Sequence, residues 1–291
     1  MRIEHWELSI DQIPLPDFAN DQISSWRPTM KDVLDTLNNL TPVIVIAGLS
    51  FFMTLETWRP YFKHGAGRGR QRRRNVGMIA IATLLAAFAG GFTAIPIAWS
   101  EANQFGLLHR VLGTTPLAIV IGIFLTDLCT YLLHVTMHKV PTLWRVHRVH
   151  HADAELDASS GIRLHPFELM FLLTMTGILL SVLGVSMASL IIYNTLALPW
   201  FLLNHSNIKY PAWFERWGSL LMSTPNWHRV HHSSFQPETD SHYGCVFSVW
   251  DRLFGTARKA NVETLQFGLE RYREPEDQTV WQLLRIPFKA L

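Results

Sequence analysis

The chain has 291 residues, of which 48% are hydrophobic and only 16% are charged, whereas an average soluble domain carries roughly 25% charged residues. Its 25 basic and 23 acidic residues avoid four long stretches, residues 36–55, 75–100, 111–126 and 169–208. So uneven a polar surface excludes an ordinary soluble fold, and a net charge of +2 gives no sign of a nucleic-acid partner.

The uncharged stretches predict membrane-spanning helices, because about 20 apolar residues cross the hydrocarbon core of a bilayer. The first two stretches each predict one helix. The third continues past Asp127 and predicts a span over about 111–133. The fourth is twice the length that one crossing needs, with Gly184 near its middle as the turn of a hairpin. We therefore predict an all-α integral membrane protein of four to five transmembrane helices, with five crossings preferred.

The charges beside these stretches predict the orientation. Residues 59–75 carry seven Lys or Arg and no acid, whereas residues 1–41 carry three bases and seven acids. Basic connections stay in the cytoplasm. Residues 1–41 are therefore expected to form an acidic, non-cytoplasmic segment, and residues 42–110 two spans joined by a basic cytoplasmic loop. Glu56, at the end of the first span, is expected to meet Arg59 or lipid headgroups.

Histidine is concentrated between residues 134 and 232, which hold ten of the 14 in the chain. Side chains three and four residues apart share one face of a helix, so closely spaced histidines point their imidazoles in one direction. All these patterns are predicted to reach the cytoplasmic side, forming a helical cap. The patterns are HVTMH (His134, His138), HRVHH (His147, His150, His151) and a second HRVHH (His228, His231, His232).

This histidine content indicates a metal centre. Imidazoles packed closely would repel one another if protonated, so neutral nitrogens bound to a cation are the simplest explanation. Imidazole suits Zn, Cu, Fe and Ni, and iron is favoured where positions remain open for oxygen. Eight histidines exceed the four ligands that close a tetrahedral zinc site, which predicts a two-metal centre. The sequence lacks HExxH, HxxEH and GxSxG motifs, which disfavours hydrolysis.

The three histidine patterns, in this order, resemble the fatty acid hydroxylase and sterol desaturase superfamily. LWRVHRVHH (143–151), RLHPFE (163–168), NHSN (204–207) and WDRLFGT (250–256) resemble it too. The resemblance covers about residues 117–256 and places the catalytic domain at 111–256. It implies a non-haem enzyme with two Fe ions, replaceable by Zn in purified protein. Such an enzyme uses O2 to hydroxylate or desaturate an unactivated C–H position of a membrane lipid.

The resemblance and the histidine spacing together assign the site residues. The expected metal ligands are His134, His138, His147, His150, His151, His205, His228, His231 and His232. A second set is expected either at the metal or beside its ligands, since bound imidazoles commonly donate to carboxylates: His165, His242, Asp127, Asp157, Glu168 and Asp240.

Three of these side chains have alternative roles. His165 would also suit the turn before a span, and Asp127 a pairing with a neighbouring helix. His242 stands where the superfamily usually has Asn, in DSHYG (240–244), and is expected to support the site or to be neutral.

The resemblance also implies partners and a location. No HPGG motif of a fused cytochrome b5 domain occurs, so a separate electron donor is expected, such as cytochrome b5 or ferredoxin with its reductase. The lipid would arrive from a bacterial inner membrane or the endoplasmic reticulum, with the active site on the cytoplasmic face. A histidine-rich metal transporter and a haem-binding electron-transfer protein are the alternative functions. The lipid, the choice between hydroxylation and desaturation, and the oligomeric state stay open.

The rest of the C-terminal region, including residues 257–291, is predicted to be cytoplasmic. Residues 209–291 carry ten basic and nine acidic residues, too many for a further span. Trp213, Phe214 and Trp217 suit either an interfacial helix on the membrane surface or the core of the cap.

Overall fold

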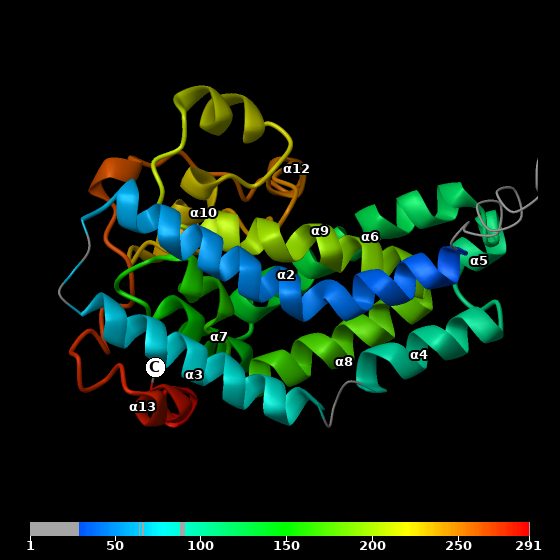
Figure 1. The fold of residues 1–291 in the computed structure, drawn as a ribbon, viewed down its shortest axis with the longest axis horizontal. Coiled ribbons are helices and arrows are strands. Elements are labelled where there is room, and N and C mark those ends of the chain that lie inside the picture. Colours follow the sequence, from blue (N-terminus) through cyan, green and yellow to red (C-terminus); the bar gives the residue numbers. More distant parts are fainter. Residues whose placement is uncertain (1–28, 64, 66, 88–90, 291) are drawn as a thin grey trace, which may run out of the picture.

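Helices dominate the computed structural model, which describes residues 29–63, 65, 67–87 and 91–290 (Figure 1). Across these ranges, β pairing consists of isolated bridges, such as the one between Pro60 and Ile208. The prediction of an all-α membrane protein is confirmed. Four described helices are long and apolar enough to cross a membrane: α2 (Met30–Trp58), α6 (Pro116–Lys139), α8 (Pro166–Leu183) and α9 (Met187–His205).

Helices α8 and α9 form the hairpin that the sequence predicts. Pro166 opens α8, and Gly184 ends it with a φ of 71°. This left-handed conformation stops a helix, and glycine adopts it without a clash from a Cβ atom. Ser186 then caps α9, its side chain accepting a hydrogen bond from the Ser189 backbone N–H at 3.2 Å.

The second predicted span is divided between two helices, α3 (Arg68–Ala87) and α4 (Gly91–Ala102). Both contact α8, and they follow one another along it (Figure 1). The residues between the two helices, 88–90, lie outside the described part of the chain. The prediction of a loop for the Arg-rich segment is wrong, because this segment forms the first turns of α3. The physical reason is that Arg72 finds buried acceptors, donating to Asp157 at 2.7 Å and to Glu56 at 2.5 Å.

Glu56, which the sequence placed near Arg59 or lipid headgroups, is fully buried. One carboxylate oxygen accepts hydrogen bonds from the backbone N–H groups of Ala158 and Asn207, both at 2.8 Å. The other oxygen pairs with Arg72. A buried charge persists when it is paired and hydrogen-bonded in this way. One acid therefore fastens α2 and α3 to two distant parts of the chain.

The short helices gather at the end of the bundle where α6 and α9 end and α8 begins (Figure 1). We call them the cap. All the candidate histidine ligands lie at this end. The cap consists of α7 (Pro141–His151), η3 (Ala158–Ile162), the π-helical η4 (Phe214–Gly218), α10 (Pro225–His231), α11 (Gln236–Thr239), α12 (Val249–Leu253), η5 (Val262–Thr264), α13 (Val280–Arg285) and η6 (Ile286–Phe288).

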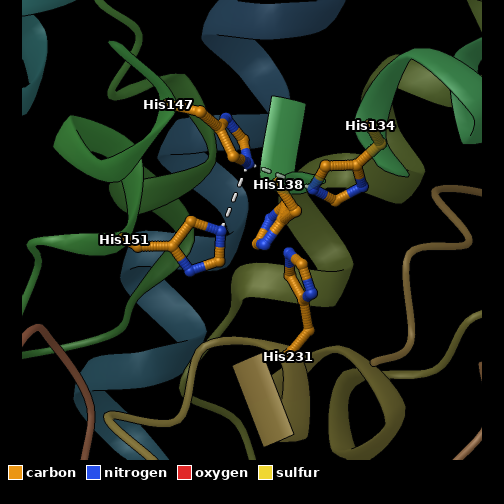
Figure 2. A group of neighbouring side chains, drawn as sticks. All are labelled: His134, His138, His147, His151 and His231. Atoms are coloured by element: carbon orange, nitrogen blue, oxygen red, sulfur yellow. Dashed lines mark hydrogen bonds between the residues drawn. The ribbon is translucent and has the colours of Figure 1, made fainter. Parts of the chain in front are cut away.

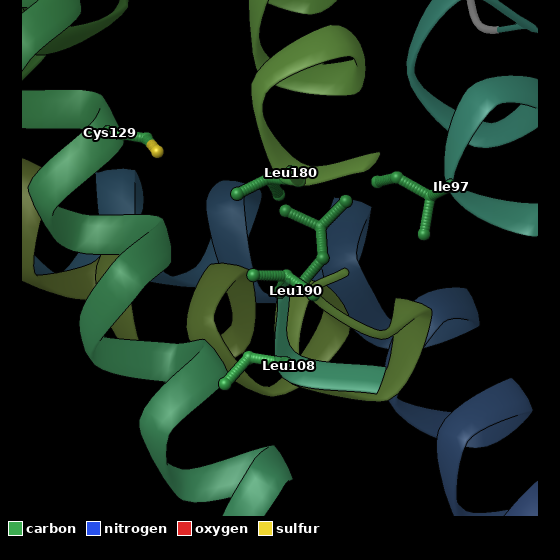
Figure 3. Packing of buried hydrophobic residues seen from close by; sticks show 6 residues of the cluster. Ile97, Leu108, Cys129, Leu180 and Leu190 are labelled. Carbon is green, nitrogen blue, oxygen red and sulfur yellow. The ribbon is translucent and has the colours of Figure 1, made fainter. Parts of the chain in front are cut away.

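The opposite end of the bundle has an apolar core. It joins α4, α6, α8 and α9 to the short helix α5 (Leu107–Leu112) (Figure 3). The buried side chains are those of Ile97, Leu108, Cys129, Leu180, Val185 and Leu190. Hydrophobic packing holds this end of the bundle. The cap end combines buried polar groups with hydrophobic clusters of its own, such as the one that joins Met78, Val149 and Leu283.

Gly177 sets the close approach of α8 to α4. A Cβ atom at this position would lie 2.2 Å from the Phe92 carbonyl oxygen and 2.8 Å from the Thr93 Cα atom. Because these are backbone atoms, they cannot move aside as a flexible side chain would. We predict that Gly177→Leu destabilises the bundle by at least 1–3 kcal/mol, the approximate cost of overpacking a core.

Thermal unfolding in detergent, followed by circular dichroism, measures this loss. Ile178→Leu at the adjacent, exposed position is the control. An unchanged midpoint for Gly177→Leu would show that the two helices do not pack this closely.

Candidate metal centre

Prolines set the directions of the helices that carry the histidine patterns. HVTMH occupies the last turns of α6, and Val140 alone separates α6 from α7. Pro141 opens α7 and Pro225 opens α10. Proline cannot continue a preceding helix but fits the first position of a new one. The histidines of α7 can therefore turn back toward those of α6.

Five imidazoles meet between α6, α7 and α10, and Figure 2 shows their rings facing one another. Each offers a ring nitrogen, and these atoms lie within 4.8 Å of one another. The Nε2 atom of His147 lies 3.2 Å from the Nε2 atoms of both His134 and His151. We call these residues, all of them buried, the five-histidine group: His134, His138, His147, His151 and His231.

Four more imidazoles meet between α7, α9 and α10, and all are buried. Their nitrogens also lie within 4.8 Å of one another. The Nε2 atom of His205 is 3.2 Å from that of His150, 3.0 Å from that of His228 and 3.2 Å from that of His232. The structure therefore brings all nine expected ligands together, in a five-histidine group and this four-histidine group.

The two groups are interleaved. In each HRVHH pattern, the first and last histidines, four residues apart, join the same group, whereas the middle histidine joins the other. His150 belongs in this way to the four-histidine group, and His231 to the five-histidine group. One turn of helix directs these side chains to two adjacent points, so neither group can form without both patterns.

Hydrogen bonds fix which nitrogen of several rings carries the proton. The Nδ1 atoms of His134, His231 and His205 lie 2.7–2.8 Å from backbone carbonyl oxygens. A carbonyl oxygen only accepts, so Nδ1 donates, and in a neutral ring Nε2 then presents a lone pair. The short Nε2 contacts therefore place lone pairs against one another. Among the described residues, the buried Nε2 atoms of His138 and His231 have no hydrogen-bond partner.

Burial keeps these rings neutral. It lowers the pKa of His147 to about 3. Burial, together with repulsion between neighbouring histidines, also lowers the pKa values of the other cap histidines, His150, His151, His228, His231 and His232. Neutral imidazole nitrogens that converge in a dry interior suit a bound cation. Donor sets of five and four nitrogens match two metal ions better than one.

Two of the expected carboxylates contact ligand histidines. Glu168 accepts a hydrogen bond from His147 Nδ1 at 2.7 Å. Asp240 lies 3.3 Å from His138 Nδ1 and 3.0 Å from the Lys139 ammonium. Such carboxylates hold the ring orientation and increase the basicity of the metal-facing nitrogen.

Asp127 and Asp157 have other partners. Asp127 accepts hydrogen bonds from the Tyr193 hydroxyl at 2.8 Å and the Trp250 indole at 2.7 Å. It therefore joins α6 to a neighbouring helix, the alternative that the sequence left open. Asp157 begins η3 and pairs with Arg72. Within the described chain, neither carboxylate is hydrogen-bonded to one of the nine histidines.

His165 and His242 lie outside both groups. His165 caps α8, with Nδ1 accepting a hydrogen bond from the Phe167 backbone N–H at 3.2 Å. The His242 ring packs edge-on against Trp227, with 4.0 Å between the ring centroids. Its Nε2 atom lies 2.7 Å from the Arg258 carbonyl oxygen. His242 also has a φ of 54°, a left-handed conformation in which Asn is common among non-glycine residues.

Backbone groups complete the site, and no pattern of residues predicts them. The carbonyl oxygen of Tyr243 orients His134. Asp251 holds this part of the chain, accepting hydrogen bonds from the backbone N–H groups of Tyr243 at 2.7 Å and Gly244 at 3.0 Å. Gly161 lies against the His205 ring, where a Cβ atom would come within 3.0 Å of Nδ1.

The arginine of each HRVHH pattern binds carbonyl oxygens outside the pattern. Arg148 donates to the Ile286 carbonyl at 2.6 Å, and Arg229 to those of Ser206 and Ile208, both at 2.8 Å. Each charge-assisted bond ties a short histidine helix to a separate segment. The C-terminal helices thus support α7, although they lie beyond the histidine patterns.

The fold and the site define a class: a polytopic membrane protein with a buried, histidine-rich centre suited to metal. Residues 119–256 match the fatty acid hydroxylase family, so this part of the chain is a fatty acid hydroxylase domain. The resemblance identified from the sequence is confirmed. No solved structure is significantly similar to the chain.

Similar proteins include an ornithine lipid hydroxylase of Rhizobium tropici, 30% identical over 140 residues that cover 47% of this chain and 41% of that protein. Alkylglycerol monooxygenase of Homo sapiens is 28% identical over 155 residues, 49% of this chain and 31% of that protein. Cholesterol 25-hydroxylase of Homo sapiens is 24% identical over 159 residues, 54% of each chain. The similar region thus spans about half or less of these relatives.

We predict that Glu168→Ala weakens metal binding by roughly 10–100-fold, the usual effect of losing a carboxylate that orients a ligand imidazole. His147 would lose the acceptor for its Nδ1 proton. Competition with a chelator, followed by elemental analysis, measures the affinity. Glu263→Ala, at an exposed position in η5, is the matched control. Equal affinities for the two variants would show that Glu168 does not hold His147 in place.

We also predict that the metal-free protein loses stability as the pH falls below about 6.5. The unfolded chain binds protons on histidine near this pH, whereas the folded chain does not until near pH 3 for His147. The unfolded state therefore gains protons first, and the free energy of unfolding decreases with decreasing pH. Thermal unfolding of chelator-treated protein between pH 8 and about 4 tests this, with metal-loaded protein as the comparison. A constant midpoint across this range would contradict neutral, buried histidines.

Proposed function

We propose that this protein is an O2-dependent, non-haem iron monooxygenase that hydroxylates an unactivated C–H position of a membrane lipid. The observation that carries the proposal is the convergence of nine neutral imidazoles in two buried groups. Breaking such a bond requires redox chemistry, which a bound iron supplies and zinc alone does not.

The relatives support the substrate class and the reaction. They are named for hydroxylation or monooxygenation of ornithine lipid, alkylglycerol and cholesterol. These three substrates are lipids of different chemical structure, so the proposal names membrane lipids as a class and no single lipid. All three names describe oxygen insertion, which favours hydroxylation over desaturation for this chain.

The proposed roles of the residues follow from their contacts. The nine histidines would hold two iron ions through the nitrogens that face one another, with Glu168 and Asp240 orienting His147 and His138. Burial would exclude water from the reacting lipid. Each turnover would consume one O2, two electrons and two protons, insert one oxygen atom and release the other as water. The electrons would come from a separate donor, such as cytochrome b5 or ferredoxin with its reductase.

The alternative functions fit the geometry less well. A haem group needs room for its macrocycle beside or between axial histidines, whereas the ring nitrogens within each histidine group lie within 4.8 Å of one another. A transporter needs polar groups along a path through the membrane, whereas the nine histidines gather at one end of the bundle. The Arg-rich start of α3 lies at this same end, which supports a cytoplasmic active site.

We predict that protein purified in mild detergent holds about two irons per chain, consistent with two histidine groups. Supplied with reductant, isotopically heavy O2 and a membrane lipid extract, it should produce lipid with one heavy oxygen, detected by mass spectrometry. His150→Ala and His231→Ala should each abolish the product, because each removes a nitrogen from one group.

His242→Asn is the matched control and should retain activity, since His242 lies outside both groups and Asn suits its backbone conformation. If zinc fills the site, reconstitution with iron should restore O2 consumption. Iron-loaded protein that incorporates no oxygen from O2 into any lipid of the extract would overturn the proposal.

A further inference from the structure

An exposed apolar stripe crosses the segment between α9 and α10. Trp213, Trp217 and Leu221 follow one another at intervals of four residues, with Leu220 beside Leu221. All four side chains are at least half exposed, from 50% for Leu220 to 68% for Leu221. The segment combines the π-helical η4 with hydrogen-bonded turns that continue to Met222.

This exposure excludes the cap core as the location of Trp213 and Trp217. Large apolar side chains grouped on one surface mark a site of interaction, whereas scattered ones need no explanation. Phe214, which the sequence grouped with them, is only partly exposed, and its ring lies near Trp200 and Tyr210. The segment therefore has an inner face that packs on the protein and an outer face that is uncovered.

The segment is attached directly to a membrane-spanning helix. Trp200, within the last turns of α9, donates its indole N–H to the Ser223 carbonyl at 2.7 Å. The rings of Trp200 and Phe214 are 6.4 Å apart. Figure 1 shows the segment projecting sideways from the cap half of the bundle. The uncovered face thus continues the lipid-facing surface of the bundle at the level where the spans end.

Basic side chains accompany the stripe. Arg216 is exposed, and its guanidinium lies 5.0 Å from the Trp217 ring centroid. Arg252, on α12, is exposed and donates to the Ser219 carbonyl. Tryptophan prefers the boundary between hydrocarbon and headgroups, and arginine beside it reaches the phosphates.

From this arrangement we propose that the stripe, Trp213, Trp217, Leu220 and Leu221, inserts into the headgroup boundary of the bilayer, with Arg216 and Arg252 at lipid phosphates. Continuity with α9 and the tryptophan and arginine content favour lipid over a second protein chain. The proposal depends on the membrane fold and not on the reaction under Proposed function.

The inserted stripe would be linked to the metal centre through a short loop. The Ser248 backbone N–H donates to the Leu221 carbonyl at 3.0 Å, and the Ser223 N–H donates to the Val246 carbonyl at 2.8 Å. The same loop supplies the carbonyl oxygen of Tyr243 that orients His134. The bilayer would therefore fix the depth of the histidine groups relative to the headgroups.

A fluorescent label on Leu221→Cys tests the insertion in full-length protein held in nanodiscs of zwitterionic and anionic phospholipid. Both native cysteines, Cys129 and Cys245, are buried and should not react. The matched control is Glu263→Cys, at an exposed position of the cap. Circular dichroism and size-exclusion profiles that match the unlabelled protein verify that each variant is folded.

The label at residue 221 should emit at shorter wavelength than the control. Lipids with a nitroxide near the headgroup should quench it several-fold more than the control, whereas aqueous iodide should quench only the control. Two outcomes would overturn the proposal. Equal quenching of both labels by iodide would place the stripe in water. Protection of the label at 221 from iodide and nitroxide lipid alike would show that protein, such as a second copy of the chain, covers the stripe.

Discussion

The convergence of neutral imidazole lone pairs is the constraint on which the cap depends. Nine buried histidines bring ring nitrogens to within 4.8 Å of one another inside each of the two groups, yet carbonyl groups already accept the protons of several rings. Without a cation the lone pairs repel, and burial prevents protonation from relieving the repulsion. A bound cation would relieve this repulsion between the ends of α6 and α9 and the short helices α7 and α10.

The interleaving of the two groups makes the site a single cooperative unit. Helix α7 contributes His150 to the four-histidine group and its other histidines to the five-histidine group, and His231 of α10 likewise joins the group that the rest of its pattern does not. A shift of either helix therefore disturbs both groups. The arginines of the two patterns counter such shifts, Arg148 through the C-terminal helices and Arg229 through the segment after α9. Polar bonds and hydrophobic packing thus stabilise the cap together, whereas a hydrophobic core stabilises the far end of the bundle.

Sequence reasoning found the long helices and the candidate ligands because both leave periodic patterns of side chains. It missed the carbonyl oxygens that orient His134 and His231, since every residue carries one and only the folded chain selects them. It also missed the burial of Glu56, because the backbone N–H groups that donate to its carboxylate come from distant parts of the chain. The basic residues at the start of α3 predict a loop for the same reason, because the partners that hold them in a helix are distant in the sequence.

The interleaving also has a consequence for biogenesis. His134, His138, His147, His150 and His151 are synthesised within 18 residues, whereas His228, His231 and His232 follow some 80 residues later. The five-histidine group still lacks His231 when α8 and α9 enter the membrane, and the four-histidine group lacks half its members. Neither group can be complete while the ribosome is still making the hairpin. If the groups hold metal as proposed, both sites are complete only after the membrane-spanning helices α6, α8 and α9 have been synthesised, so metal would bind late in assembly.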